Sequence, residues 1–194
     1  MTAEVVDQDG HPVTNAVVSL ASASGSTPAA SSRLANEKTI DQRNETFLPL
    51  VTIVPKGGRV LFANNDQTTH QVYSFSAVKR FEITLARGET SPPFVFDTAG
   101  VAALGCNIHD HMIAYVYVAD SPWTALTGAD GRAVFNDMPR GAFQAQLWHP
   151  QFPQGRAAPS VRVDIGNEDA RLVLTVKLGS APVGRMAHSH GGIY

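Results

Sequence analysis

The chain has 194 residues, with 15 Lys and Arg against 17 Asp and Glu, so its formal net charge is −2, and charged residues make up only 16% of it. A chain so poor in charge is not expected to bind nucleic acid through phosphate contacts. Hydrophobic residues are 43% of the total, which is enough for a packed core and excludes wholesale disorder. At about 100–200 residues per domain, the length fits one large domain or two small ones.

Cys106 is the only cysteine, so no intramolecular disulfide can form, and stability must come from the core or from a bound metal. The longest apolar runs, such as residues 114–119, are far shorter than the ~20 residues that a membrane helix needs, so no membrane insertion is expected. No basic segment followed by an apolar segment comes after Met1, so no signal peptide is expected in this chain.

Short strand-like runs bounded by turn signals recur along the chain, whereas helical periodicity is nearly absent. This pattern predicts an all-β fold, a sandwich or a barrel. A segment rich in Ser and Ala, residues 21–37, is predicted to be a linker or a long loop, and residues 181–194 are predicted to form a flexible tail. The predicted strands are 13–20, 48–54, 59–63, 71–76, 80–85, 94–97, 113–119, 133–135, 143–148, 160–165 and 171–178.

Two stretches on either side of a central block share a turn followed by a strand-like run. Residues 4–20 read EVVDQDGHPVTNAVVSL, and residues 124–148 read TALTGADGRAVFNDMPRGAFQAQLW. Together they resemble the small β-sandwich domain found beside carboxypeptidases, the carboxypeptidase-regulatory-like domain. The residues that carry this resemblance are Asp7, Gly10, Pro12, Val13, Ala16, Thr127, Asp130, Gly131, Phe135, Pro139, Gly141, Phe143, His149 and Pro150.

The resemblance implies that the two stretches form one discontinuous β-sandwich domain, made of residues 1–22 and 121–180. Residues 38–120 would then be a second domain, inserted into a loop of the first. Such an insertion is physically easy when the ends of the inserted domain lie close together. Residues 1–20 are therefore expected to pair with strands from residues 121–178.

Candidate metal ligands gather in the central block. Cys106, His109 and Met112 lie within seven residues, and His70 comes from a distant strand-like segment. A thiolate and two imidazoles can bind copper in a trigonal plane, with a weak thioether on the axis. Thiolate stabilises Cu(I), whereas imidazole suits both oxidation states, so these residue types favour a mononuclear copper site that exchanges single electrons.

Three other interpretations of these residues remain. Zinc is possible with His70, Cys106, His109 and His111, although structural zinc sites usually contain two pairs of ligands and this chain has one cysteine. A Cys106–His109 nucleophilic pair is disfavoured, because both side chains on one tight loop would point at one ligand and no orienting residue is identified. A free cysteine in an inert core cluster is the third interpretation.

The central block resembles the cupredoxins, the plastocyanin-like blue-copper family that includes proteins labelled as methylamine-utilisation proteins. The resemblance implies a Greek-key β-sandwich that binds one copper ion, with His70, Cys106 and His109 in the equatorial plane and Met112 on the axis. The residues that match the family pattern are Gly58, Val60, Phe62, Asn64 and Asp66 on a strand, then His70, Gly100, Cys106 and His109.

Two departures from the family pattern concern the ligand loop. Only Asp110 and His111 separate His109 from Met112, whereas plastocyanins usually have about four residues there, so His111 is the alternative fourth ligand. Gln71 stands where the family tends to have an asparagine that braces this loop.

The alternation of side chains along a strand favours Met112 over His111. The odd positions from His111 to Tyr117 share one face, and the even positions from Met112 to Val118 share the other. The even face is apolar and is expected to face the core, whereas the tyrosines tolerate a wetter face.

By its resemblance, the protein is expected to be an electron-transfer protein and not an enzyme, working in the periplasm or otherwise outside the cytoplasm, with a transient redox partner protein. Electrons would pass through His109, and Ile108 and Ile113 would supply a small apolar contact patch. The alternative function is a non-redox copper carrier or copper-resistance protein, to which His188 and His190 in the tail would contribute. A structural β protein with a vestigial site is the third possibility.

Two further histidines lie outside this pattern. His149 follows a predicted strand and is predicted to be structural, and His11 is expected in a turn.

Overall fold

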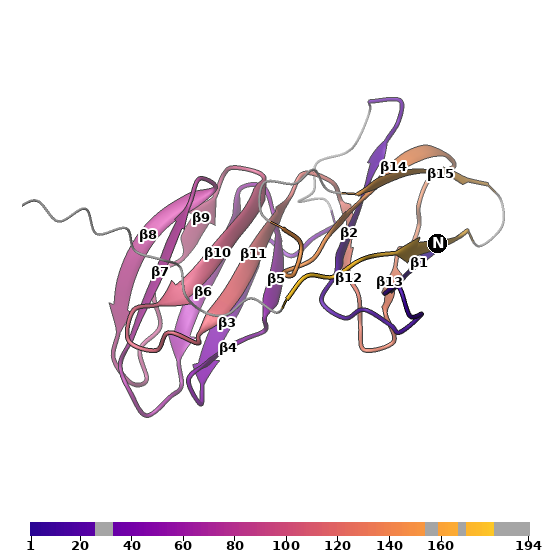
Figure 1. Cartoon of the computed structure of the whole chain (residues 1–194). Helices are drawn as coiled ribbons and strands as arrows, with labels where there is room; N and C mark the ends of the chain where they lie inside the picture. The colour runs from indigo at the N-terminus through magenta and orange to yellow at the C-terminus, as the bar shows by residue number, and fades with distance from the viewer. Residues whose placement is uncertain (26–32, 154–158, 167–169, 181–194) are drawn as a thin grey trace, which may run out of the picture.

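The computed structural model describes residues 1–25, 33–153, 159–166 and 170–180, which form strands, turns and loops (Figure 1). No helix in these ranges is long and apolar enough to span a bilayer. The strands in chain order are β1 (Thr2–Val6), β2 (Val17–Ser22), β3 (Glu37–Arg43), β4 (Thr46–Leu48), β5 (Val51–Pro55), β6 (Gly58–Asn64), β7 (His70–Ser76), β8 (Lys79–Leu85), β9 (Phe94–Phe96), β10 (Gly100–Cys106), β11 (Ile113–Ala119), β12 (Trp123–Leu126), β13 (Arg132–Val134), β14 (Gly141–Trp148), β15 (Ser160–Ile165) and β16 (Arg171–Thr175).

The all-β class predicted from the sequence is confirmed. Strands β3 to β11, here called the central unit, form a five-stranded sheet in the order β5-β11-β10-β7-β8 and a four-stranded sheet in the order β4-β3-β6-β9. The chain passes repeatedly from one sheet to the other, as in a Greek-key sandwich. Alternate side chains of both sheets meet in one apolar core that contains Phe47, Phe62, Phe96, Leu104 and Val116.

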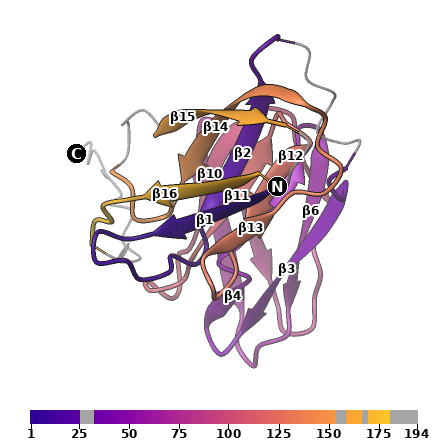
Figure 2. The ribbon, with the colours of Figure 1, turned by 90° about the vertical axis from the view of Figure 1, so that its right-hand side faces the viewer.

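The remaining strands form a second β-sandwich, here called the outer unit, which lies beside the central unit in Figure 1. Its two sheets have the orders β13-β1-β16 and β12-β2-β14-β15. Figure 2 shows β1 between β13 and β16. The predicted pairing of residues 1–20 with later strands is confirmed, because the strand partners of β1 and β2 in the described part of the chain all follow the central unit.

The two units meet at the tyrosine face of β11. Trp148 on β14 packs against Tyr115 and Tyr117, with ring centroids 5.3 Å and 6.0 Å apart. Tyr115 is therefore buried, although the sequence pattern favoured a wetter face for both tyrosines. The outer unit excludes water from this face. The residue pattern of β11 alone could not predict this, because the strands that cover it lie elsewhere in the sequence.

Several predicted strands have different limits in the structure. The run 48–54 is broken after Leu48 into β4 and β5, and the run 13–20 is a strand only from Val17. Strands β1, β3, β10 and β12 were absent from the predicted set. The tail 181–194, with His188 and His190, lies outside the described residues.

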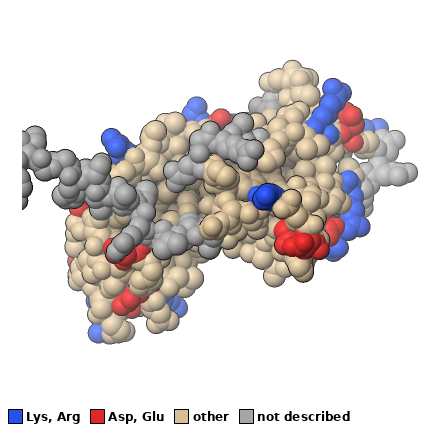
Figure 3. Space-filling view, in the orientation of Figure 1, with Lys and Arg blue, Asp and Glu red and all other residues tan. Residues whose placement is uncertain are grey.

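Charged side chains are sparse on the face shown in Figure 3, where they form small separate groups of both signs. This surface agrees with a composition in which charged residues are only 16%.

Candidate metal centre

Backbone pairing brings three of the predicted ligands together at one end of the five-stranded sheet. His70 is the first residue of β7, and Cys106 is the last residue of β10. The two strands are antiparallel neighbours, with Cys106 opposite Val72, and the Asn107 N–H donates to the Gln71 carbonyl at 3.1 Å. The ladder therefore places the end of β10 beside the start of β7.

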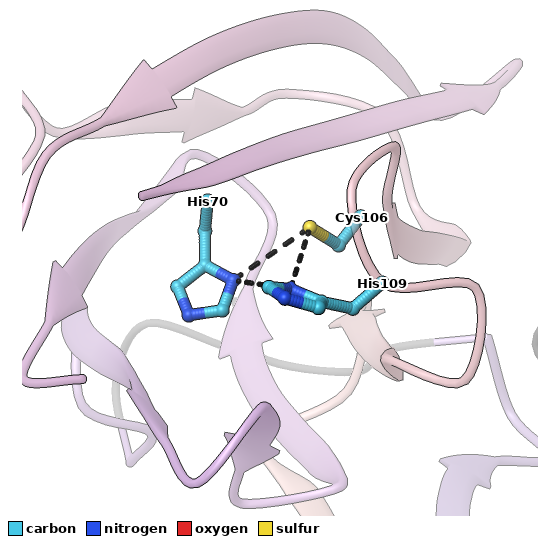
Figure 4. A group of neighbouring side chains, drawn as sticks. All are labelled: His70, Cys106 and His109. Atoms are coloured by element: carbon cyan, nitrogen blue, oxygen red, sulfur yellow. Dashed lines mark hydrogen bonds between the residues drawn. The ribbon is translucent and has the colours of Figure 1, made fainter. Parts of the chain in front are cut away.

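The loop between β10 and β11 supplies the third side chain. Its turn is closed by the Met112 N–H, which donates to the His109 carbonyl at 3.0 Å. Figure 4 shows the side chains of His70, Cys106 and His109 pointing toward one another. The sequence prediction that these three residues meet is thus in agreement with the geometry.

Three donor atoms converge within 4.0 Å of one another. His70 Nδ1 lies 3.7 Å from Cys106 Sγ and 3.2 Å from His109 Nδ1, and Cys106 Sγ lies 4.0 Å from His109 Nδ1. His70 and Cys106 are buried, whereas the side chain of His109 keeps 16% of its surface exposed. The group is therefore closed on the protein side and reaches solvent through His109.

The spacing of these donors fits a single metal ion. Consider an ion placed about 2.05 Å from each nitrogen and about 2.3 Å from the sulfur. The three separations between the donor atoms then correspond to donor–ion–donor angles that sum to about 353°. Three tetrahedral angles sum to about 328°, so the fit is closer to a trigonal plane than to a tetrahedron. One thiolate and two imidazoles in a plane are the donors that a blue-copper site uses.

Asp66 orients the ring of His70. His70 Nε2 lies 3.1 Å from Asp66 Oδ2, so this nitrogen carries the ring hydrogen and donates it to the carboxylate. Nδ1 is then the unprotonated ring nitrogen, with a lone pair available to a metal, and it faces Cys106. The N–H groups of Glu45 and Gln67 donate to the Asp66 carboxylate and hold its pKa below the ordinary value, and His70 adds to this effect against the opposing effect of burial. Asp66 is therefore ionised at neutral pH.

Asn64 holds the segment that carries Asp66. Its side-chain oxygen accepts the Asp66 N–H at 3.0 Å, and its amide nitrogen donates to the carbonyls of Thr68 and Leu85 at 2.9 Å each. Asn64 is fully buried. The sequence pattern included Asn64 and Asp66 as strand positions, but their role behind His70 is visible only in the folded chain.

Met112 and His111 point to opposite sides of the loop. Met112 keeps only 2% of its surface exposed and belongs to the same core cluster as Cys106, Ala114 and Val116. The side chain of His111 is 64% exposed, with Nε2 3.6 Å from a Glu45 carboxylate oxygen. The alternation prediction is confirmed in placing Met112 on the core side, and axial coordination by Met112 stays a prediction.

The brace expected from an asparagine at position 71 takes a different form. The side-chain amide of Gln71 donates to Glu82 on the neighbouring strand β8, away from the ligand loop. The Gln71 backbone carbonyl accepts the Asn107 N–H instead. The ligand loop is thus held at this position by the main chain.

Gly105, next to Cys106, provides room for an aromatic ring. A Cβ atom at Gly105 would lie 2.5 Å from the ring of Tyr73 on β7. Burial raises the pKa of the Tyr73 phenol, and the nearby charges of Cys106 and Asp110 raise it further. A neutral ring therefore packs directly against the backbone that precedes the thiol.

Of the two other described histidines, His149 has the structural surroundings that were predicted for it. The buried ring of His149 lies with Nε2 3.1 Å from the Thr14 carbonyl, and its Nδ1 accepts the Gln151 N–H at 3.1 Å. Burial lowers the pKa of His149, opposed by the bond to Thr14. His11 lies in an exposed turn, with Nδ1 3.3 Å from an Asp7 carboxylate oxygen.

Comparison with known proteins finds similarity among solved structures alone. No protein-family model matches the chain, and no curated protein matches it. A purple cupredoxin from Nitrosopumilus maritimus is 22% identical, covering 42% of this chain and 98% of that one, with a TM-score of 0.38. Amicyanin from Paracoccus versutus is 17% identical, covering 52% of this chain and 98% of that one, with a TM-score of 0.39.

A copper-containing nitrite reductase from Thermus scotoductus is 21% identical, covering 48% of this chain and 27% of that one, with a TM-score of 0.41. At these identities and TM-scores, the chemistry of the chain has to be inferred from its own residues.

Proposed function

We propose that this protein binds one copper ion and carries single electrons, with His70, Cys106 and His109 as equatorial ligands and Met112 as the axial ligand. The observation that supports this most strongly is the convergence of one thiol and two imidazole nitrogens at separations of 3.2–4.0 Å, which suit an ion that lies close to the plane of the three donor atoms. Soft sulfur with two imidazoles suits copper better than it suits a hard cation.

The bound ion would supply one-electron redox chemistry, and the chain supplies a donor set that barely has to move. His70 and Cys106 are fixed on paired strands, and the Asp66 carboxylate fixes the ring of His70. A donor set held in this way limits the rearrangement that accompanies a change of charge at the site.

His109 is the ligand through which a partner protein would exchange electrons, because its side chain is the exposed member of the group. The neighbouring Ile108 is 52% exposed and offers an apolar contact, whereas Ile113 is only partly exposed. A small contact of this kind suits a transient partner.

We also propose that the two units are domains, with residues 38–120 inserted in a discontinuous carboxypeptidase-regulatory-like domain made of residues 1–22 and 121–180. The strand pairing that joins β1 and β2 to β12–β16 supports this division. In this proposal the protein is an electron carrier rather than an enzyme and works outside the cytoplasm.

Reversible redox cycling of the copper-loaded protein tests the proposed function. Ascorbate should bleach a visible thiolate-to-copper band, and ferricyanide should restore it over repeated cycles without loss of copper. Loss of copper on reduction would contradict electron transfer and would favour a copper carrier.

The carrier alternative has one observation in its favour. His111 and Glu45 lie at the surface beside His109, so polar donors extend from the buried group toward solvent. A carrier should release its copper to a competing chelator faster when the ion is reduced, whereas an electron-transfer site should retain it in both states.

A further inference from the structure

The turn between β3 and β4 places an acidic side chain over the metal centre. Arg43 pairs with Thr46, so Asn44 and Glu45 are the two residues of a tight hairpin. Both have positive φ angles, 49° and 54°, as the twist of a two-residue hairpin of this type requires. This geometry fixes where the Glu45 backbone and side chain lie.

Glu45 lies directly beside His109 and is linked to His70 through the carboxylate of Asp66. Its backbone N–H donates to Asp66 Oδ2 at 2.6 Å, the same oxygen that faces His70 Nε2. Its side-chain oxygens lie 3.5 Å from His109 Nε2 and 3.6 Å from His111 Nε2. No residue of this turn belongs to the cupredoxin pattern that carries the ligands.

The side chain acts from outside the donor group. His109 has Nδ1 toward His70 and Cys106, and the carboxylate meets the opposite ring nitrogen, Nε2. At 3.5 Å from Nε2 the carboxylate favours the ring hydrogen on that nitrogen and leaves Nδ1 free to bind a metal, as the shorter carboxylate–histidine hydrogen bonds behind many metal ligands do. Glu45 is thus placed to orient His109 rather than to bind the ion itself.

We propose that Glu45 is a positioning residue for the exposed ligand, which sets the tautomer of His109 and adds a negative charge beside the copper. The copper part of this inference rests on the proposed function. The charge favours Cu(II) over Cu(I), so it lowers the reduction potential. Because the side chain of Glu45 is 44% exposed, salt should weaken this charge effect.

Three variants separate the orienting role from the charge. Glu45→Gln keeps an acceptor of the same length but removes the charge, and Glu45→Ala removes both. Both variants keep the backbone N–H that donates to Asp66. Glu37→Gln is the matched control, because Glu37 is an exposed glutamate paired with Arg59 at the opposite end of β3.

The tautomer is measured on the metal-free protein by NMR of the ring nitrogens, at about pH 8, where an ordinary histidine is neutral. Wild type, Glu45→Gln and Glu37→Gln should carry the His109 ring hydrogen on Nε2, whereas Glu45→Ala should show a mixture. A His109 tautomer that is unchanged in Glu45→Ala would overturn the orienting role.

Copper-loaded protein tests the charge. Glu45→Gln and Glu45→Ala should both raise the reduction potential, by an amount that shrinks with added salt, and Glu45→Ala should also weaken Cu(II) binding about tenfold. Potentials equal to that of Glu37→Gln would overturn the charge effect. If wild type binds no copper, the proposed function fails, while the metal-free NMR still decides whether Glu45 orients His109.

Discussion

Replacing Asp66 with asparagine tests the network behind His70. The carboxylate accepts three N–H groups: Oδ2 faces the Glu45 N–H at 2.6 Å and His70 Nε2 at 3.1 Å, and Oδ1 faces the Gln67 N–H at 2.9 Å. An asparagine of the same shape has one acceptor oxygen. In either orientation its NH₂ group must therefore face at least one donor.

The cost of Asp66→Asn follows from that count. If the amide oxygen takes the Oδ2 place, the Gln67 N–H loses its acceptor, which costs about 1 kcal/mol, the lower end of the range for an unsatisfied donor, because Gln67 is exposed and this bond is only partly buried. The bond to His70 also loses its charge, which is worth about 1 kcal/mol. The free energy of unfolding should fall by about 2 kcal/mol, and Cu(II) affinity should fall about 10- to 100-fold.

Urea unfolding of the metal-free protein, followed by circular dichroism, measures the first effect, and competition with a copper chelator measures the second. Asp164→Asn is the control, because this residue is 72% exposed on β15 and its ion pair among the described residues is with the similarly exposed Arg162, so its loss should cost less than about 0.5 kcal/mol. If Asp66→Asn unfolds and binds copper as Asp164→Asn does, the orientation of His70 does not depend on Asp66.

Three further predictions use single variants. Cys106→Ser should abolish the visible band and lower copper affinity by orders of magnitude, because a hydroxyl is a hard and weakly acidic donor. If the visible absorption band is retained, Cys106 is not the copper ligand. Met112→Leu should keep the copper and raise its potential in voltammetry, whereas His111→Ala should leave the copper spectrum unchanged; the reverse outcome would make His111 the fourth ligand. The pKa of His149 is lower in the folded chain than in the unfolded chain, so below about pH 6.5 the unfolded chain binds a proton there more readily. The free energy of unfolding should therefore decrease as the pH is lowered from about 7.5 to about 5. His149→Gln should make this decrease smaller, as measured by urea unfolding at the two pH values.

The strands that could be predicted are those with β-branched and aromatic residues between turn signals. β11 reads IAYVYVA and was predicted with its observed limits. β10 reads GVAALGC and was missed, because Gly and Ala carry no β-strand preference although the strand is buried between β7 and β11. β3 reads EKTIDQR and was missed because only Ile40 and Gln42 face the core.

The donor group was predictable because thiol and imidazole are rare and chemically distinctive, and two of its members are close in sequence. The groups behind it were not. Glu45 is a turn residue that reaches His109 only because β3 and β4 fold against the ligand end of the other sheet. Asp66 is one of many aspartates after a strand, and nothing in the sequence shows that its oxygen faces His70.

Titration of the metal-free protein with Cu(II), followed by visible absorption, tests most directly whether His70, Cys106 and His109 form a redox-capable copper site. We predict an intense thiolate-to-copper band that rises linearly and stops at one equivalent of copper per chain. Absence of stoichiometric binding, or tight binding without colour, would contradict the assignment of Cys106 as a copper ligand in an electron-transfer site.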